Sequence, residues 1–456
     1  MSEVPPDSNY QFRLGDGLLG AQMLFVAFGA LVLVPILTGL DPNVALFTAG
    51  IGTLIFQVIT KGKVPVFLAS SFAFIAPIIY GVQTWGIPAT LCGLTAAGVL
   101  YVFMSFAIRY FGAGILHKYL PAVVTGPVIM VIGLVLAPVA VHMAMGRTGD
   151  GSAWLVPDKT AMIVSGVSLV TTALVALLGK GWLRLLPILS GICAGYATSM
   201  ILDFTGYSAS YQASFDPGNL QNWTSSALIS FAPIAGKAWL AMPAFVLPEW
   251  KWEAILFIVP VAIAPAIEHF GDVLAIGSIT GKDYVKDPGI ENTMLGDGIA
   301  TSIASMLGGP PNTTYSEVSG AVALTKAYNP AIMTWAAFTA IFLSFVGKIG
   351  AILATIPTPV MGGIMILLFG MITVVGINTL VKSGQDLMTP RNLIIVAVIL
   401  VCGIGGMKFT AGSFAIEKIG LAGILGIVLN IILPGERTPS SLMQPECQAA
   451  PDLSAH

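Results

Sequence analysis

One short stretch of this chain cannot continue the helices that its surroundings predict. Residues 308–325 read Gly-Gly-Pro-Pro-Asn-Thr-Thr-Tyr-Ser-Glu-Val-Ser-Gly-Ala-Val-Ala-Leu-Thr and lie in a strongly apolar region. Glycine is flexible and proline lacks a backbone N–H, so these residues interrupt a helix. In a bilayer every backbone polar group needs a partner, so such a break survives only where protein buries it or where it lines a cavity. We therefore expect a functional cavity at this break.

The composition identifies the class of protein. Of the 456 residues, 56% are hydrophobic and only 9% are charged, whereas soluble domains carry about 25% charged residues. The chain is therefore predicted to be a polytopic membrane protein that lies in a lipid bilayer. A formal net charge of −2 gives no sign of a nucleic-acid partner, and the four cysteines show no metal-ligand spacing. We expect no cofactor and no bound metal.

Fourteen apolar segments are predicted to be membrane spans, since a helix needs about 20 apolar residues to cross a bilayer. Two of them, 295–308 and 315–328, are too short to cross alone. The others are predicted at 17–38, 44–60, 65–82, 88–107, 119–141, 160–178, 185–203, 254–276, 332–347, 356–380, 392–406 and 415–433. With the N-terminus inside, most of the twenty Lys and Arg residues fall in cytoplasmic turns, so both termini are predicted to be cytoplasmic.

The spans divide into two halves with similar motifs. The run Pro121-Ala-Val-Val-Thr-Gly126 opens one span, and Pro357-Thr-Pro-Val-Met-Gly362 opens another 236 positions later; chance similarity between apolar stretches is the alternative explanation. A second half of seven spans, an odd number, would enter the membrane inverted, as in many secondary transporters. We expect an N-terminal tail, a first repeat, an outer loop with a short interfacial helix near 226–242, a second repeat and a C-terminal tail, at residues 1–16, 17–203, 204–253, 254–433 and 434–456.

Glu317 follows the break directly, where the next helix is predicted to begin. The first backbone N–H groups of a helix have no partner within it, and the positive end of the helix dipole lies behind them. A substrate carbonyl would bind to those N–H groups, and a substrate N–H would bind to the Glu317 carboxylate. The alternative is a capping glutamate that faces water.

A second carboxylate, Glu268, lies in another apolar run, 259–280, and Asp272 is stacked four residues on along the same helix face. Two carboxylates this close in an apolar setting repel each other, so one is expected to hold a proton near neutral pH. A proton-coupled carrier requires such a group. The alternative is a pair that lines a water-filled vestibule. His269 points about 100° away from Glu268 and is expected to be a structural partner.

A second interrupted stretch, 64–77, contains Ser70 and Ser71 directly before Phe72. Exposed backbone there would supply further hydrogen-bond donors, and the Phe72 ring would stack on a planar ligand; core packing is the alternative role of this side chain. Tyr315 flanks the other break in the same way. Since the runs around the two acids hold no Lys or Arg, the expected substrate is a neutral, planar molecule with both N–H and carbonyl groups.

One long motif resembles that of a known family. The signature of the nucleobase–ascorbate transporter family, also called nucleobase:cation symporter-2, is similar to the run Asn312-Thr-Thr-Tyr-Ser-Glu317-Val-Ser-Gly320-Ala-Val-Ala-Leu-Thr325-Lys326. The likeness is closest to the bacterial uracil permeases of that family and extends over nearly the whole chain. It includes the helix of Glu268 and the runs Phe28-Gly-Ala-Leu-Val-Leu-Val-Pro35, Lys61-Gly-Lys-Val-Pro65, Ser70-Ser-Phe-Ala-Phe-Ile-Ala-Pro77 and Ile356-Pro-Thr-Pro-Val-Met-Gly-Gly363.

This resemblance implies an all-α polytopic fold of fourteen transmembrane segments in two inverted seven-span repeats. Spans 1–4 and 8–11 would form a core domain, and spans 5–7 and 12–14 would form a gate domain that carries a homodimer interface. The third and tenth spans would each begin with a short strand before a half-helix, and the substrate would lie between them.

Carried over by position, the resemblance also implies which residues bind the nucleobase. Glu268 and Glu317 would accept its N–H groups, and the coupled proton would be carried by Glu268 or Asp272. The remaining residues around the base would be Ala30, Phe72, Tyr315 and Ser316. This chain departs from the uracil permeases of the family at Met23, Asp272, Ser316, Val318 and Phe369. These differences bear on the exact base and on the proton relay, and they leave the fold untouched.

The predicted function is import of uracil by proton symport across a bacterial inner membrane. A xanthine or urate carrier of the same family is the alternative, because xanthine presents the same imide edge as uracil. The acid at position 317 favours uracil, since purine-type members tend to have Gln there. Na⁺ is the alternative coupling ion.

Two other classes of protein fit the sequence less well. An anion carrier of the same architecture would need a cation in the site, and the acids at 268 and 317 argue against it. An enzyme is disfavoured, because the chain has neither a His-Glu-x-x-His zinc motif nor a Gly-x-Ser-x-Gly nucleophile motif. The run Gly296-Asp297-Gly298 invites comparison with an aspartyl protease, but we interpret Asp297 as a helix-start residue near the cytoplasmic face.

Overall fold

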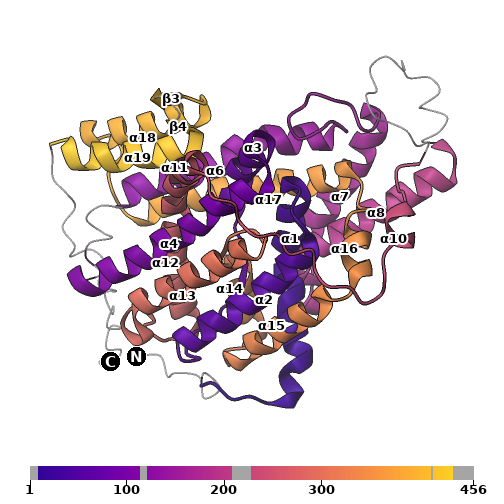
Figure 1. Ribbon diagram of the computed structural model, residues 1–456, viewed down its shortest axis with the longest axis horizontal. Coiled ribbons are helices and arrows are strands. Elements are labelled where there is room, and N and C mark those ends of the chain that lie inside the picture. Colours follow the sequence, from indigo (N-terminus) through magenta and orange to yellow (C-terminus); the bar gives the residue numbers. More distant parts are fainter. Residues whose placement is uncertain (1–8, 113, 115–120, 208–226, 412–413, 435–456) are drawn as a thin grey trace, which may run out of the picture.

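Long apolar helices make up most of the structure. The computed structural model describes residues 9–112, 114, 121–207, 227–411 and 414–434 (Figure 1). Within this part of the chain, eight helical segments are long and apolar enough to cross a membrane, and four shorter apolar helices accompany them. This agrees with the prediction of a mostly helical membrane protein.

Helices follow one another along the chain, and the short strands β1 and β2 lie at the two breaks in the sequence. The elements up to α8 are η1 (Leu14–Asp16), α1 (Gly17–Thr38), α2 (Pro42–Ile59), β1 (Leu68–Ser70), η2 (Phe72–Phe74), α3 (Ile75–Trp85), α4 (Ile87–Phe111), α6 (Ala122–Ala144), α7 (Asp158–Leu178), η3 (Gly181–Leu185) and α8 (Pro187–Phe204).

The elements that follow α8 contain a second break. They are α10 (Ala232–Ala235), α11 (Trp252–Ile258), η5 (Val259–Ala262), α12 (Ile263–Thr280), η6 (Val285–Gly289), α13 (Ile290–Met306), β2 (Asn312–Thr314), α14 (Ser316–Thr325), α15 (Ala331–Ser344), α16 (Gly347–Leu353), α17 (Thr358–Lys382), α18 (Pro390–Ile404), β3 (Lys408–Ala411), β4 (Phe414–Glu417) and α19 (Lys418–Ile432).

Helix packing sorts these elements into two groups. In one group α2 packs on α13 and α15, α1 packs on α15, and α4 packs on α11 and α13. In the other group α6 packs on α17, α18 and α19, and α7 packs on α8 and α17. Figure 1 shows α18 and α19 at one end of the molecule and α8 with α16 at the other.

Glycines allow the closest helix crossings. A Cβ atom on Gly98 of α4 would lie 2.8 Å from the carbonyl oxygen of Gly298 of α13, and a Cβ on Gly298 would lie 2.9 Å from the carbonyl oxygen of Gly98. Between α6 and α17, a Cβ on Gly133 would lie 2.5 Å from the carbonyl oxygen of Phe369. Small residues at such crossings let helix backbones approach each other in a membrane, where apolar burial alone does not drive association.

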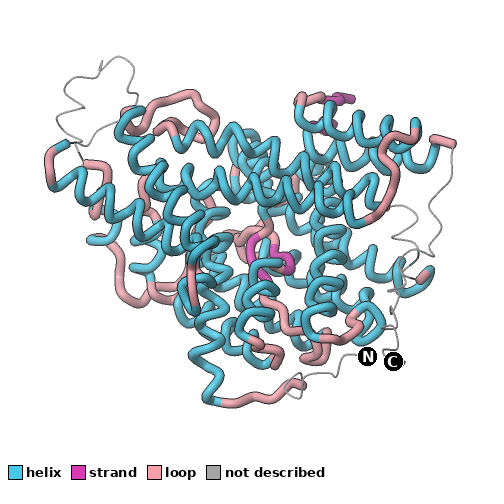
Figure 2. Tube along the Cα trace, turned by 180° about the vertical axis from the view of Figure 1, so that it is seen from behind, coloured by secondary structure: helices cyan, strands magenta, loops and turns pink. Residues whose placement is uncertain are grey.

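Two short strands join the two halves of the chain at the middle of the bundle (Figure 2). β1 pairs with β2 in antiparallel register, with Leu68 opposite Thr314 and Ser70 opposite Asn312. All residues of both strands are buried. Side chains satisfy part of the remaining backbone: the Thr53 hydroxyl accepts a 2.9 Å hydrogen bond from the Leu68 N–H, and the Thr301 hydroxyl donates a 2.5 Å bond to the Asn312 carbonyl. Interrupted backbone is therefore enclosed by protein, as a bilayer requires.

The outer connection differs from the prediction. We expected an interfacial helix near 226–242, but the described residues there contain only the short helix α10, and 208–226 lie outside the described residues. The following residues are extended and pass between helix ends, with the Val246 N–H 3.4 Å from the Leu307 carbonyl and the Glu249 N–H 2.9 Å from the Pro88 carbonyl. Gly236 follows α10 as its C-cap, and Pro243 and Pro248 disfavour helical backbone in the residues before them, so no helix resumes before α11.

Candidate functional site

The paired strands bring the starts of two half-helices together. β1 runs through Ser71 into η2 and α3, and β2 runs through Tyr315 into α14. The Ser71 N–H donates a 2.9 Å hydrogen bond to the Pro311 carbonyl, which extends the pairing to the edge of both breaks. As a result the rings of Phe72 and Tyr315 lie with centroids 6.0 Å apart, tilted by 46°. These two aromatic residues, which come from separate stretches of the sequence, therefore lie next to each other.

The two predicted substrate carboxylates also meet there. Glu317 lies in the first turn of α14 and Glu268 in the middle of α12, and both are only partly covered by protein. They are close enough to interact electrostatically, and the Tyr315 hydroxyl lies beside the Glu317 carboxylate. Of Ser316 the structure describes only the backbone, which begins α14. Acceptor oxygens and the start of a half-helix thus stand side by side.

Behind the carboxylates lies a buried polar network. The Thr314 hydroxyl donates a 2.9 Å hydrogen bond to Asp272 Oδ2 and lies 3.4 Å from His269 Nδ1. His269 Nε2 lies 3.1 Å from the hydroxyl of Thr293, and His269 Nδ1 lies 3.4 Å from Asp297 Oδ2. His269 and Asp297 are completely buried. The imidazole therefore holds α12 and α13 together through polar contacts, in keeping with the structural role expected for it.

The sequence interpretation of Asp297 was wrong. We took it for a helix-start residue near the cytoplasmic face, whereas it lies in the middle of α13 with no exposed surface. α13 begins as early as Ile290, so Asp297 is two turns inside the helix. Its neighbours on both sides lie at close helix contacts, Gly296 against the Phe56 ring and Gly298 against Tyr101 Cβ.

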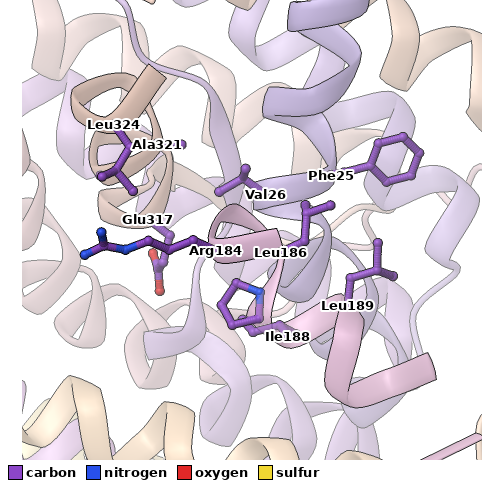
Figure 3. A pocket seen from close by; sticks show the side chains of 11 residues that line it. Phe25, Val26, Arg184, Leu186, Ile188, Leu189, Glu317, Ala321 and Leu324 are labelled. Atoms are coloured by element: carbon purple, nitrogen blue, oxygen red, sulfur yellow. The ribbon is translucent and has the colours of Figure 1, made fainter. Parts of the chain in front are cut away.

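A cavity of about 190 Å³ opens onto Glu317 (Figure 3). Most of its wall is apolar and comes from α1, α14 and the start of α8. The lining residues are Phe25, Val26, Arg184, Leu186, Pro187, Ile188, Leu189, Glu317, Gly320, Ala321 and Leu324. Ala30 is completely buried in α1, one turn beyond Val26, and does not line this cavity; neither do Phe72, Tyr315 and Glu268. In this conformation the cavity thus reaches one of the two acids.

Arg184 is a charged residue of the cavity that was not among the predicted site residues. It belongs to η3, the turn between α7 and α8, and its side chain reaches across the cavity toward α14 (Figure 3). We expected no Lys or Arg at the site because none occurs in the runs around the two acids. The contact depends on how α8 packs beside α14, and no local pattern in the sequence signals it.

Several buried hydroxyl groups around the breaks have no hydrogen-bond partner among the described residues. They belong to Ser70, Ser71, Thr313 and Ser319. Buried polar groups are nearly always paired with protein or water. These hydroxyls are therefore available to an ordered water or to a polar ligand.

The chain matches the Permease family over residues 17–412. It is 50% identical over 434 residues to the probable uracil permease of Haemophilus influenzae, covering 95% of this chain and 98% of that one. It is 42% identical to the uracil permease of Bacillus caldolyticus, over 91% of each chain, and 37% identical to the uracil permease of Escherichia coli, over 91% of this chain and 90% of that one.

Solved structures share the fold at low sequence identity. The transmembrane domain of the cyanobacterial bicarbonate transporter BicA superposes with a TM-score of 0.57 at 13% identity, covering 93% of this chain and 99% of that one. The murine anion transporter Slc26a9 in its inward-facing state superposes with a TM-score of 0.64 at 13% identity, covering 94% and 69%. The chain therefore has the membrane-transporter fold of these proteins.

Proposed function

This chain belongs to the Permease family, as its resemblance to nucleobase–ascorbate transporters predicted, and from that premise we propose that it imports uracil by proton symport. Its relatives are permeases, which move molecules across a membrane and are not enzymes. The relatives named as uracil permeases favour uracil over xanthine or urate.

The observation that carries the proposal is the position of Glu317. It stands at the start of a half-helix, lines the cavity, and interacts electrostatically with Glu268. Uracil is flat and neutral and carries both N–H and carbonyl groups. The two carboxylates would accept its N–H groups, while the backbone N–H groups at the start of α14 and the hydroxyls of Ser70 and Ser71 would donate to its carbonyls.

Aromatic rings would hold the plane of the base. Phe72 and Tyr315 lie on the two broken segments with ring centroids 6.0 Å apart. A ring closing on either face of the base would add apolar contact and stacking, worth about 0.5–1.5 kcal/mol per aromatic pair. Ala30 is expected to become part of the wall only when the surrounding helices shift.

Proton coupling would use the acids of α12. Asp272 is four residues from Glu268 on one helix face, and both interact electrostatically with Asp297. A proton on Asp272 or Glu268 would relieve their mutual repulsion. A base that donates an N–H group to the Glu268 carboxylate would stabilise the charge of Glu268, and that charge would in turn favour the proton on neighbouring Asp272. Substrate and proton would then be bound and released together, with Na⁺ as the alternative ion.

We propose that the chain has fourteen spans, arranged as two repeats of seven spans that are inverted relative to each other. The paired strands β1 and β2 start the predicted third and tenth spans, and the motif-bearing helices α6 and α17 pack on each other. Spans 1–4 and 8–11 would move as a core domain against a gate domain of spans 5–7 and 12–14, which would also form a homodimer. Both termini would be cytoplasmic, in an inner membrane.

Uptake of radiolabelled uracil into proteoliposomes tests this function. A pH gradient, acidic outside, should drive accumulation, and an equal Na⁺ gradient should not. Excess unlabelled xanthine or urate should compete poorly. Uptake that xanthine blocks as well as unlabelled uracil does would favour the purine alternative, and accumulation that needs Na⁺ would refute proton symport.

A further inference from the structure

Arg184 and Glu317 face the same cavity from two different groups of helices. Arg184 comes from η3, which joins α7 to α8, and Glu317 comes from α14, which packs on α1 and α12. Figure 3 shows the long side chain of Arg184 extending past the Glu317 carboxylate. In the described part of the chain the two groups are not ion-paired. Two opposite charges thus line one cavity, and under the proposed function the transported base would pass through this cavity.

The rest of the cavity strengthens their attraction. Apart from Arg184 and Glu317, its wall consists of apolar side chains and Gly320. Attraction between opposite charges grows as water is excluded, because the effective dielectric constant falls. Arg184 itself is exposed, so its guanidinium stays hydrated at the mouth until it has a partner. When no base is bound, the Glu317 carboxylate is the acidic group of this cavity with which Arg184 can pair.

The turn that carries Arg184 is built to hold its backbone in place. A Cβ on Gly179 would lie 3.0 Å from the Arg184 backbone N and Cα, and Gly181 adopts a positive φ of 56°. Pro187 then starts α8, and Leu186 and Pro187 line the same cavity. The Arg184 backbone is thus fixed at the mouth while its flexible side chain is free to swing.

We propose that Arg184 is a release residue for the transported base, an inference that rests on the proposed function. When the cavity is open on this side, the guanidinium competes with the N–H group of the base for the Glu317 carboxylate. As the base leaves, Arg184 pairs with the carboxylate, which otherwise would remain unpaired in an apolar cavity. Arg184 therefore weakens binding of the base in this conformation and speeds its release. It is a positioning residue that acts through Glu317.

The test compares Arg184→Gln, Arg184→Lys and Lys180→Gln with the unmodified protein. Purified proteins are titrated with uracil by calorimetry, and the release of bound labelled uracil is timed. Arg184→Gln is expected to lower the Kd by about 3- to 10-fold, mainly through a slower release rate, since affinity changes among related complexes are mostly changes of koff. Arg184→Lys should lie between, because lysine keeps the charge and loses the two-pronged geometry.

Lys180 provides the matched control. It is an exposed cation next to the same turn and does not line the cavity. Its replacement should leave the Kd and the release rate unchanged. An Arg184→Gln protein with unchanged or weaker binding, or one that behaves like Lys180→Gln, overturns the inference; if Arg184→Gln does not fold, an Arg184→Lys protein with unmodified release overturns it equally. Absence of uracil binding by the unmodified protein would instead refute the proposed function.

Discussion

His269 Nδ1 lies 3.4 Å from Asp297 Oδ2, with both side chains completely buried between α12 and α13. Through Thr314, the same imidazole is linked to Asp272 and to the end of β2. The network therefore connects the helix of Glu268 to the strand that precedes Glu317. We expect a change of proton or partner on one acid to affect the other, because hydrogen bonds in a buried network polarise one another.

Replacement of Asp297 by Asn should disable transport. Asparagine keeps the shape of the side chain and loses the negative charge beside His269. A buried polar group that loses its partner costs about 1–3 kcal/mol, and 1.4 kcal/mol is about tenfold, so uracil uptake should fall about 5- to 100-fold. Thr293→Val, which removes the neutral contact at His269 Nε2, should cost only about fivefold. Uptake by Asp297→Asn equal to that of the unmodified protein would show the network to be dispensable.

Changes at Glu317 and Tyr315 should have effects of different size. Glu317 is expected to be an essential hydrogen-bond acceptor for the base, and the Tyr315 hydroxyl is expected only to assist it. Glu317→Ala should abolish uptake and binding of labelled uracil while the protein still reaches the membrane, and Glu268→Gln should do the same. Tyr315→Phe keeps the ring that faces Phe72 and loses the hydroxyl beside Glu317. One neutral hydrogen bond is worth about 0.5–1.5 kcal/mol, so its KM should rise about 2- to 10-fold. Near-normal uptake by Glu317→Ala would contradict the proposed site.

Local chemistry explains how far the sequence predicts this structure. The breaks before Phe72 and Glu317 follow from Gly, Pro and small polar residues inside apolar runs, and the class of protein follows from the scarcity of charge. The pairing of Leu68 with Thr314 depends on contacts between distant parts of the chain, so the residues alone do not predict that register. Strands at the starts of the third and tenth spans were expected only because of the resemblance to a known family, and not from the physical properties of these residues.

The sequence did not reveal the burial of Asp297 or the position of Arg184 at the cavity, for a related reason. Whether Asp297 is buried depends on where α13 begins and on which helices cross it, and local charge patterns report neither. Arg184 belongs to a turn, and a turn residue reaches a cavity only through the packing of the helices on either side. Positive charge in short turns predicts topology well, and it does not reveal which of those charges points inward.

The pH dependence of uptake should arise from the acids within the membrane and not from Asp150 in the turn between α6 and α7. The Thr148 hydroxyl and the Ser152 hydroxyl and N–H bond to the Asp150 carboxylate and lower its pKa from 3.8 to about 2. A lowered pKa means that its contribution to stability is complete above about pH 4 and is lost only as the pH falls through about 2. Asp150→Asn should therefore leave the pH profile of uptake between pH 5 and 8 unchanged, at roughly unmodified rates.

Asp272→Asn should remove the pH dependence of whatever transport remains. The remaining activity is measured as exchange of labelled for unlabelled uracil, because exchange needs no net proton movement. A profile that moves with Asp150→Asn, or stays intact in Asp272→Asn, would place the coupled proton elsewhere.

The crossing of α4 and α13 should be sensitive to added volume. A Cβ on Gly298 would lie 2.7 Å from Tyr101 Cβ and 2.9 Å from the Gly98 carbonyl oxygen, so Gly298→Ala must push the two helices apart. Overpacking of this kind costs about 1–3 kcal/mol, and α13 also carries Asp297. The apparent melting temperature of the purified protein should fall, and uptake should fall with it. Gly166→Ala in α7 is the matched control, since a Cβ there meets nothing within 4 Å; a Gly298→Ala protein as stable as this control would mean that the crossing can open without cost.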